Sequence, residues 1–277
     1  MILDLHTHSN ASDGIYTPEE VVQIAHDNGV EVFALTDHDT VAGVRKAGTA
    51  CLKAGIRFVP GCELSCTWHK KTVHVVALGI QDFSFINARA EVMSAVREKR
   101  ARLIAQKLES LGIEGTYEEA VSAAKSTLNL SRRHFAMALV RRGAVSTEDE
   151  AFEKFLGDGG PAYVETQWDD LPGIQRLISQ SGAVAVMAHP GRYHFDFPYS
   201  TDGLLKEFKA LGGRAIEVTT GSHTRDDNRK YAKVAKKMGF YASTGSDFHG
   251  GRPGRPGPGM QAPLPEGLSC VLELLGN

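Results

Sequence analysis

Residues 2–8 read Ile-Leu-Asp-Leu-His-Thr-His, an apolar run that ends in two histidines, and this arrangement recurs along the chain. Similar runs rich in Val, Ile, Leu and Ala occur at residues 32–39, 57–63, 73–79, 183–190, 215–220 and 240–249. Such runs indicate strands that are buried on both faces, as in a parallel sheet. Most of them end in or next to His, Asp or Glu, so polar side chains gather where the strands stop.

Helical segments separate many of these runs. Thr17 can cap a helix that starts at Pro18 and whose apolar positions continue to Gly29. Residues 200–211 and 225–238 have similar patterns. Alternating strands and helices favour a parallel α/β barrel, in which the active groups lie at the carboxyl ends of the strands.

The alternation stops in residues 82–164, where the sequence is helical and charged. Within it, residues 89–142 contain eleven Lys or Arg residues against six Glu and no Asp. This basic stretch can attract a polyanion or form a solvated helix face. We predict one barrel domain, residues 1–81 and 165–277, with a helical insertion, residues 82–164, that caps the mouth of the active site. Residues 250–259 are rich in Gly and Pro and predict a loop.

Composition favours an ordinary globular protein. The 277 residues are 42% hydrophobic and 23% charged, with a net charge of −2. No apolar run approaches the roughly 20 residues that a membrane span needs, and the first residues do not resemble a secretory signal. We expect a cytoplasmic protein with no membrane association and no obligate protein partner. The cysteines are too unevenly spaced for a disulfide framework: Cys51, Cys62, Cys66 and Cys270.

The His and carboxylate side chains near the strand ends are the strongest functional signal. Imidazole and carboxylate together suit Mn, Fe and Zn. His6 and His8 are two residues apart, so an extended strand turns both rings to the same side. A lone His-x-His is more often a satisfied polar pair, but a His or acid at nearly every strand end predicts a metal centre. The nine candidate ligands, enough for two or three metals, are His6, His8, Asp13, His38, Glu63, His74, His189, Asp247 and His249.

The reaction class predicted from this centre is hydrolysis, most naturally of a phosphate ester. The sequence has neither a Gly-x-Ser-x-Gly elbow nor a Walker glycine loop. A multi-metal centre can activate a water and neutralise the phosphoryl oxygens. Asp37 and Asp39 flank His38 and can orient it or serve the turn. Cys62 and Cys66 indicate buried packing rather than zinc, because no second Cys pair completes a site.

Together these motifs resemble the polymerase and histidinol phosphatase (PHP) family of metallo-phosphoesterases. The elements that occur in the family's order are His6-Thr-His8 with Asp13, Thr36-Asp-His-Asp39, Gly61-Cys-Glu63, His74, His189-Pro190 and Ser246-Asp-Phe-His249. The resemblance implies a distorted (β/α)7 barrel with two or three divalent ions per chain. We expect Mn²⁺, with Fe²⁺ or Zn²⁺ as alternatives.

The resemblance also implies how the ligands are shared. One metal would be held by His6, His8, Glu63 and Asp247. A second metal, to which Glu63 bridges, would be held by His74 and His189. A third metal site, or a catalytic acid/base group, would be formed by Asp13, His38 and His249. A histidine there can protonate the leaving alkoxide, since its ordinary pKa lies near neutral.

The insertion resembles the branch that includes nucleoside 3′,5′-bisphosphate phosphatases and 5′-to-3′ exoribonucleases of short RNA. The substrate-binding stretch that this implies is Ser131, Arg132, Arg133 and His134. Arg can grip a phosphate through two hydrogen bonds. Further candidates, which solvent exposure or a structural role would equally explain, are Lys99, Arg100, Arg102, Arg192 and His223.

The leading hypothesis is a phosphatase that removes the 3′-phosphate of a nucleoside 3′,5′-bisphosphate such as pAp, which yields AMP. A 5′-to-3′ exoribonuclease acting on short 5′-phosphorylated RNA would use the same chemistry. Histidinol phosphate hydrolysis is less favoured, because a monophosphate gives the basic insertion no second anion, and C–N hydrolysis less still. A non-catalytic metal-binding module of a nucleic-acid enzyme should have lost ligands, whereas all nine positions are filled.

Overall fold

The structure, a computed structural model, describes residues 1–124, 129–251 and 254–276. It forms two compact units: unit 1 comprises Met1–Asn87 and Gln167–Asn277, and unit 2 comprises Ala88–Thr166. Residues 125–128 of the predicted insertion and 252–253 of the predicted loop lie outside the described residues. The capping role of the insertion stays a prediction.

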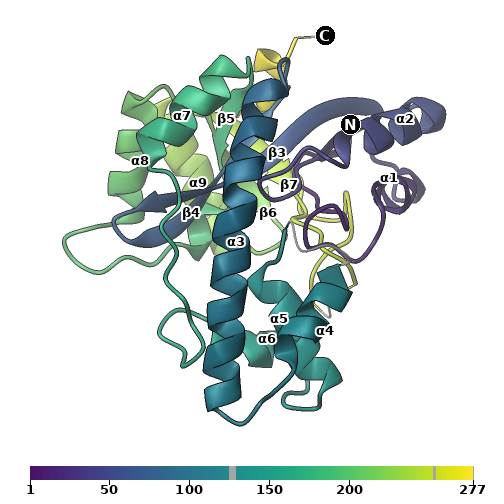
Figure 1. Ribbon diagram of the computed structural model, residues 1–277. Coiled ribbons are helices and arrows are strands. Elements are labelled where there is room, and N and C mark those ends of the chain that lie inside the picture. Colours follow the sequence, from purple (N-terminus) through teal and green to yellow (C-terminus); the bar gives the residue numbers. More distant parts are fainter. Residues whose placement is uncertain (125–128, 252–253, 277) are drawn as a thin grey trace. The chain divides into compact units, whose positions relative to one another are not determined.

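Unit 1 is built around one sheet (Figure 1). Among the described residues its strands, in order across the sheet, are β1 (Leu3–Asp4), β2 (Val32–Leu35), β3 (Arg57–Trp68), β4 (Lys71–Leu78), β5 (Val184–Met187), β6 (Ala215–Thr220) and β7 (Tyr241–Gly245). A hydrogen bond from Leu5 N to Thr244 O, 3.0 Å long, and a parallel bridge between Thr7 and Phe248 join the two edges. The sheet therefore nearly closes, and the predicted distorted seven-stranded barrel is confirmed.

The barrel departs from the all-parallel pattern at β4. This strand runs antiparallel to β3 and β5, whereas the other neighbouring strands are parallel. Only His69 and Lys70 separate β3 from β4, and both have positive φ angles, 44° and 66°. A tight two-residue turn makes an antiparallel pair, because a parallel connection needs a crossover of a dozen or more residues. The expectation of an all-parallel sheet is therefore wrong at this strand.

Helices cover the sheet of unit 1 on two sides. In Figure 1, α1 and α2 lie together to the right, next to β2 and β3, and α7, α8 and α9 lie to the left. Their bounds are α1 (Pro18–Asp27), α2 (Val44–Ala54), α7 (Leu171–Gln180), α8 (Thr201–Ala210) and α9 (Arg225–Met238), with short 3-10 turns η2 (Pro190–Arg192) and η3 (Val271–Leu274). Thr17 Oγ1 accepts a hydrogen bond from Glu20 N, and Glu20 Oε2 accepts one from Thr17 N. This capping box confirms the predicted start of the first helix.

The core of unit 1 follows the alternation of side chains along its strands. In β4, Val76 and Leu78 pack with Leu5 and Val186 in one buried cluster. Val75 belongs to another buried cluster of this unit, which includes side chains of α7 and α8. Successive residues of a strand point to opposite faces, so one set fills the barrel and the other packs under the helices.

All the regular secondary structure in the described part of unit 2 is helical. It contains most of α3 (Ser84–Ser110), followed by α4 (Thr116–Ala124), α5 (Arg132–Arg141), α6 (Glu148–Ala151) and the π-helical turn η1 (Phe152–Leu156). Ile104, Leu108, Phe135, Leu139 and Leu156 are buried in its own apolar core. Across the described part of the whole chain, no helix is both long and apolar enough to cross a membrane.

Candidate metal centre

All nine predicted ligands belong to unit 1, and most of them follow a strand. They are His6 and His8 after β1, Asp13 in the next loop, His38 after β2, Glu63 in β3, His74 in β4, His189 after β5, and Asp247 and His249 after β7. Every strand except β4 runs in the same direction, so the carboxyl ends of these strands meet at one edge of the barrel. The structure brings the nine side chains together at this edge.

The most buried group contains His6, His8, Glu63 and Asp247. One ligand atom from each of these residues lies within 4.8 Å of the others. Glu63 Oε2 is 3.1 Å from His6 Nε2 and 3.2 Å from His8 Nε2. Asp247 Oδ1 is 3.3 Å from His8 Nε2. The four side chains are at most 2% exposed, so they form a compact, buried set of nitrogen and oxygen ligands.

Glu63 turns its two oxygens to different histidines. Oε2 faces His6 and His8, and it also lies 3.1 Å from His38 Nδ1. Oε1 lies 3.0 Å from His74 Nδ1 and 3.0 Å from His189 Nε2. A carboxylate that bridges two metals requires this division of its oxygens, and the bridging role stays a prediction.

The third group contains His8, Asp13, His38 and His249, whose ligand atoms again lie within 4.8 Å of one another. His249 Nε2 is 3.3 Å from Asp13 Oδ1, and its ring stacks on that of His8 with 3.9 Å between centroids. His249 and His38 are each 14% exposed, whereas His8 is fully buried. This group therefore lies closer to solvent than the first.

The buried carboxylates favour positive charge on His6 and His8, and this raises the pKa of both rings. Burial lowers the pKa of His6, but the carboxylates of Glu217 and Glu63 outweigh burial and raise that pKa well above its ordinary value. Burial also opposes charge on His8, but hydrogen bonds to Asp247 and Glu63 raise the pKa of His8 to about 9. Metal ions would supply the same charge without the protons.

Two other histidines are held neutral, as metal ligands must be. Burial lowers the pKa of His38 to about 3 in spite of the nearby carboxylates. Burial and the charge of Arg192 lower the pKa of His189 to about 4. Neutral imidazole nitrogens facing ionised carboxylates are a donor set for divalent first-row metals. The side chains present therefore fit a centre of two or three ions.

The backbone at this edge is strained at three residues that are not glycine. The φ angles are +52° at Asp39, +28° at His189 and +54° at Asp247. Left-handed conformations of such residues cost of order 1 kcal/mol or more each and concentrate at functional sites. Two of the three are predicted ligands, so the fold bends the chain in order to aim them.

Comparison with known proteins identifies the family. Residues 4–128 match the family model described as PHP domain. Over 250 residues the chain is 42% identical to a 3′,5′-nucleoside bisphosphate phosphatase of Chromobacterium violaceum, which covers 89% of this chain and 87% of that relative. The chain belongs to the PHP family. The resemblance inferred from the motifs is therefore confirmed.

Two further comparisons agree with the PHP assignment. A 5′-3′ exoribonuclease of Haemophilus influenzae is 38% identical over 247 residues, which make up 89% of each chain. The solved structure of an amidohydrolase from Chromobacterium violaceum superposes with a TM-score of 0.93 at 39% identity, over 99% of this chain and 96% of that one. The fold of this PHP chain is thus shared along nearly its whole length.

Two buried carboxylates that are not among the nine predicted ligands of this PHP chain accept hydrogen bonds from residues next to the site. Asp37 accepts hydrogen bonds from Ser9 N and Ser9 Oγ, each 2.7 Å long. Asp39 accepts hydrogen bonds from Ser65 N at 2.8 Å and Ser65 Oγ at 2.7 Å. Asp37 and Asp39 therefore bind neighbouring loops and strands, and their role in orienting His38 stays a prediction.

Sequence reasoning missed Glu217, which lies in β6 and is 1% exposed. Its Oε1 is 2.6 Å from His6 Nδ1, and its Oε2 accepts a hydrogen bond of 2.6 Å from His189 N. The signal was a single acid inside the otherwise uncharged run at residues 215–220. A charged residue within a buried strand needs a partner.

The predicted substrate stretch begins helix α5 in unit 2. Ser131 Oγ accepts a hydrogen bond of 3.1 Å from Arg133 N, and His134 Nδ1 accepts one of 3.0 Å from Ser131 N. The Arg133 guanidinium is 5% exposed and binds Glu148 through Nε at 2.8 Å and Nη2 at 3.2 Å. These contacts stabilise unit 2 itself, and the phosphate-binding role of the stretch stays a prediction.

The remaining basic candidates of unit 2 differ in exposure. Arg132 lies over the ring of Tyr163, 5.6 Å from its centroid. Arg102 is 62% exposed and pairs with Glu98 at 2.8 Å. Lys99 is exposed and Arg100 is half-buried. Lys99 and Arg102 are therefore the more exposed candidates, and the Arg102 guanidinium also lies 4.7 Å from the centroid of the Tyr117 ring.

Two candidates of unit 1 are engaged close to the nine ligands. His223 Nε2 accepts a hydrogen bond of 3.0 Å from Gly191 N, and its Nδ1 lies 3.1 Å from Val218 O. Burial lowers the pKa of His223, so the ring is a neutral link between two backbone segments. Arg192 forms an ion pair with Asp247. Of the two, Arg192 is the one that contacts a predicted ligand.

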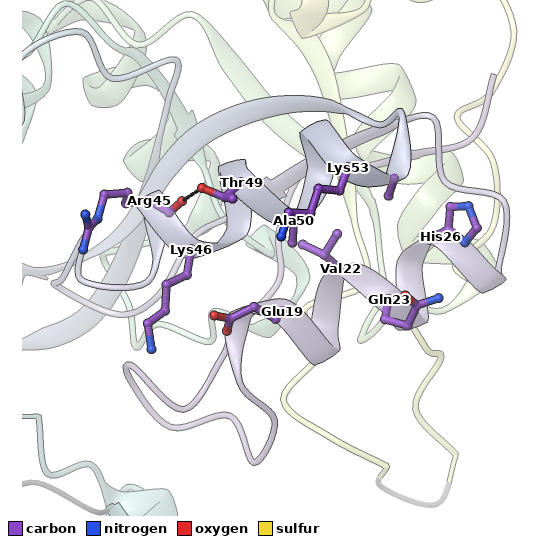
Figure 2. A pocket seen from close by; sticks show the side chains of 10 residues that line it. Glu19, Val22, Gln23, His26, Arg45, Lys46, Thr49, Ala50 and Lys53 are labelled. Atoms are coloured by element: carbon purple, nitrogen blue, oxygen red, sulfur yellow. Dashed lines mark hydrogen bonds between the residues drawn. The ribbon is translucent and has the colours of Figure 1, made fainter.

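A pocket of about 580 Å³ lies between α1 and α2, away from the predicted ligands (Figure 2). Its walls are Glu19, Val22, Gln23 and His26 from α1, and Arg45, Lys46, Thr49, Ala50, Lys53 and Ala54 from α2. None of the nine ligands lines it. The metal centre and this surface pocket are therefore separate features of unit 1.

Proposed function

We propose that this chain is a metal-dependent phosphoesterase that removes the 3′-phosphate from nucleoside 3′,5′-bisphosphates such as pAp. The observation that carries the proposal is the cluster of nine imidazole and carboxylate groups, in a chain 42% identical to a relative named for this activity. We propose Mn²⁺ as the native ion. His6, His8, Glu63 and Asp247 would hold one ion, and Glu63, His74 and His189 a second.

Side chains beside the proposed metals can position the substrate and transfer a proton. Bound divalent ions supply positive charge that favours ionisation of the attacking water and offsets the charge of the phosphoryl oxygens. Asp13 and His249 lie 3.3 Å apart on the more exposed side of the cluster, where a substrate oxygen can reach them. His249 Nδ1 is 2.9 Å from the carbonyl oxygen of Asp247, which directs Nε2 toward Asp13. We propose His249 as the acid that protonates the leaving 3′ oxygen.

The second phosphate of the substrate needs a separate anion site. We propose that the basic residues of unit 2, led by Arg132, Lys99 and Arg102, provide it. Arg and Lys bind phosphate by charge-assisted hydrogen bonds. Replacing these residues with Ala should raise the KM for pAp and leave the metal content unchanged.

A second activity, 5′-to-3′ hydrolysis of short 5′-phosphorylated RNA, is favoured by the relative from Haemophilus influenzae at 38% identity. The phosphodiester after the first nucleotide of such RNA has the same position relative to the 5′-phosphate as the 3′-phosphate of pAp. We propose that one centre serves both substrates.

The test is release of phosphate from pAp by Mn²⁺-loaded protein, with and without a chelator. Asp13→Ala and His249→Ala should abolish turnover while the far-UV circular dichroism spectrum stays unchanged. His26→Ala is the matched control, because His26 is exposed on α1 outside the cluster. No turnover of pAp or of a 5′-phosphorylated trinucleotide at full metal occupancy would refute both activities. Metal content near zero would instead favour a non-catalytic module.

A further inference from the structure

Glu217 contacts two of the nine predicted ligands at once. Its carboxylate is 1% exposed, with Oε1 2.6 Å from His6 Nδ1 and Oε2 2.6 Å from His189 N. We propose that Glu217 is a positioning residue that fixes the ring of His6 and the peptide of His189, and so sets the metal affinity of the centre. The inference rests on the proposed metal-dependent function.

The strand that carries Glu217 aims it at the cluster. Its neighbours Ile216 and Val218 are buried in the apolar cluster under the helices, so alternation turns Glu217 to the other face of β6. The register with β7 shifts here, since Glu217 pairs with Ser243 but Thr219 pairs with Thr244. A bulge of one residue in a strand re-aims nearby side chains and is common beside active sites.

For His6, the contact decides which ring nitrogen can bind a metal. A neutral imidazole has one N–H, and a carboxylate can only accept. Glu217 therefore keeps the proton on His6 Nδ1 and leaves the lone pair on Nε2. His6 Nε2 is the nitrogen that lies 3.1 Å from Glu63 Oε2 and 3.6 Å from Asp247 Oδ1. Carboxylate partners of this kind raise ligand basicity and fix ring orientation.

For His189, the contact holds a strained backbone. The residue has φ +28° and ψ +57°, and the hydrogen bond from its N–H to Glu217 ties that peptide to β6. In this conformation His189 Nε2 lies 3.0 Å from Glu63 Oε1. One side chain thus orients a ligand of each of the two proposed metals.

Glu217→Gln tests the inference, because glutamine has the same shape as glutamate but a different set of hydrogen-bonding groups. Its amide has one acceptor and one donor, whereas His6 Nδ1 and His189 N both need an acceptor. If the amide oxygen stays with His189 N, the amide NH₂ faces His6 Nδ1, and the His6 proton must move to Nε2. We expect the Zn²⁺ affinity, measured by competition with a chelator, to fall about 10- to 100-fold. We also expect the Nδ1–H signal of His6 in ¹⁵N NMR of the Zn²⁺-loaded protein to disappear.

Two other variants separate positioning from packing. Glu217→Asp keeps a pure acceptor, so it should retain the Nδ1–H signal and bind Zn²⁺ more tightly than Glu217→Gln. A packing role predicts the reverse order, since glutamine preserves the volume, and that order would overturn the inference. Glu207→Gln is the matched control, because the Glu207 carboxylate accepts a hydrogen bond of 2.9 Å from Trp68 Nε1. Replacing this carboxylate with an amide should leave the Zn²⁺ affinity unchanged.

The outcome is independent of the substrate. Wild-type protein that binds Zn²⁺ but hydrolyses neither pAp nor RNA would refute the proposed function and leave the role of Glu217 intact. Wild-type affinity and an unchanged His6 signal in Glu217→Gln would refute the role of Glu217, whatever the protein hydrolyses.

Discussion

Gly245, the last residue of β7, lies so close to His6 that we expect Gly245→Ala to disturb both the barrel and the metal centre. A Cβ atom at this position would lie 2.3 Å from His6 Cβ and 2.7 Å from His6 N. Carbon atoms in contact normally lie about 3.5–4.0 Å apart, so the two segments must separate by roughly 1 Å or more. That movement weakens the hydrogen bonds from Leu5 N to Thr244 O, 3.0 Å, and from Asp247 N to His6 O, 2.8 Å.

The cost follows from these contacts. Overpacking of a tight core costs about 1–3 kcal/mol, and each weakened backbone hydrogen bond adds up to about 1 kcal/mol. We therefore expect Gly245→Ala to lower the free energy of unfolding by about 1–5 kcal/mol, measured by urea unfolding in chelator, and to reduce metal content after dialysis. Gly251→Ala is the control, because its Cβ would meet nothing within 4 Å. Wild-type stability and metal content in Gly245→Ala would refute the close approach of β7 to His6.

Three further predictions concern buried charges. Asp37→Ala removes the acceptor of two hydrogen bonds of 2.7 Å from Ser9 and should cost about 3 kcal/mol in urea unfolding, whereas no change would contradict that anchoring. Arg133→Ala leaves Glu148 without its buried cation and should cost about 2–4 kcal/mol; a raised KM for pAp at unchanged stability would instead identify Arg133 as a substrate contact. Burial raises the pKa of the Asp4 carboxyl from 3.8 to about 6. The contribution of this shift to the free energy of unfolding is therefore full below pH 3.8 and is lost as the pH rises through about 6. A ¹³C NMR titration midpoint of the Asp4 carboxyl near 4 would contradict this prediction.

Much of the fold follows from local sequence signals. The capping box at Thr17 and the helix at Arg225–Met238 depend on residues a few positions apart, so the sequence displays them directly. The direction of β4 was not visible in the same way. Its turn consists of His69 and Lys70, which adopt the left-handed angles usually taken by Asn and Gly. Tertiary pairing of β3 with β4 overrides the preference of those two residues.

The candidate site could be anticipated where a residue type is unusual for its position. His6 and His8 at the end of an apolar run required a polar environment, and parallel strands supply a common edge for such residues. Glu217 was not found because its partners lie after β1 and after β5, and only the folded barrel brings them within 2.6 Å. Ser131 and His134 show the opposite difficulty. The sequence pattern that predicted a phosphate-binding stretch also forms a local helix cap.

The contact between His6 and Asp247 joins residues that are far apart in the sequence, and this separation affects folding during synthesis. Loop closure over such a separation is costly and slow compared with local folding. While the ribosome is still translating the middle of the chain, the first histidines have emerged, but their acidic partner does not yet exist. A nascent chain therefore cannot complete the group of His6, His8, Glu63 and Asp247 before residue 247 has left the exit tunnel.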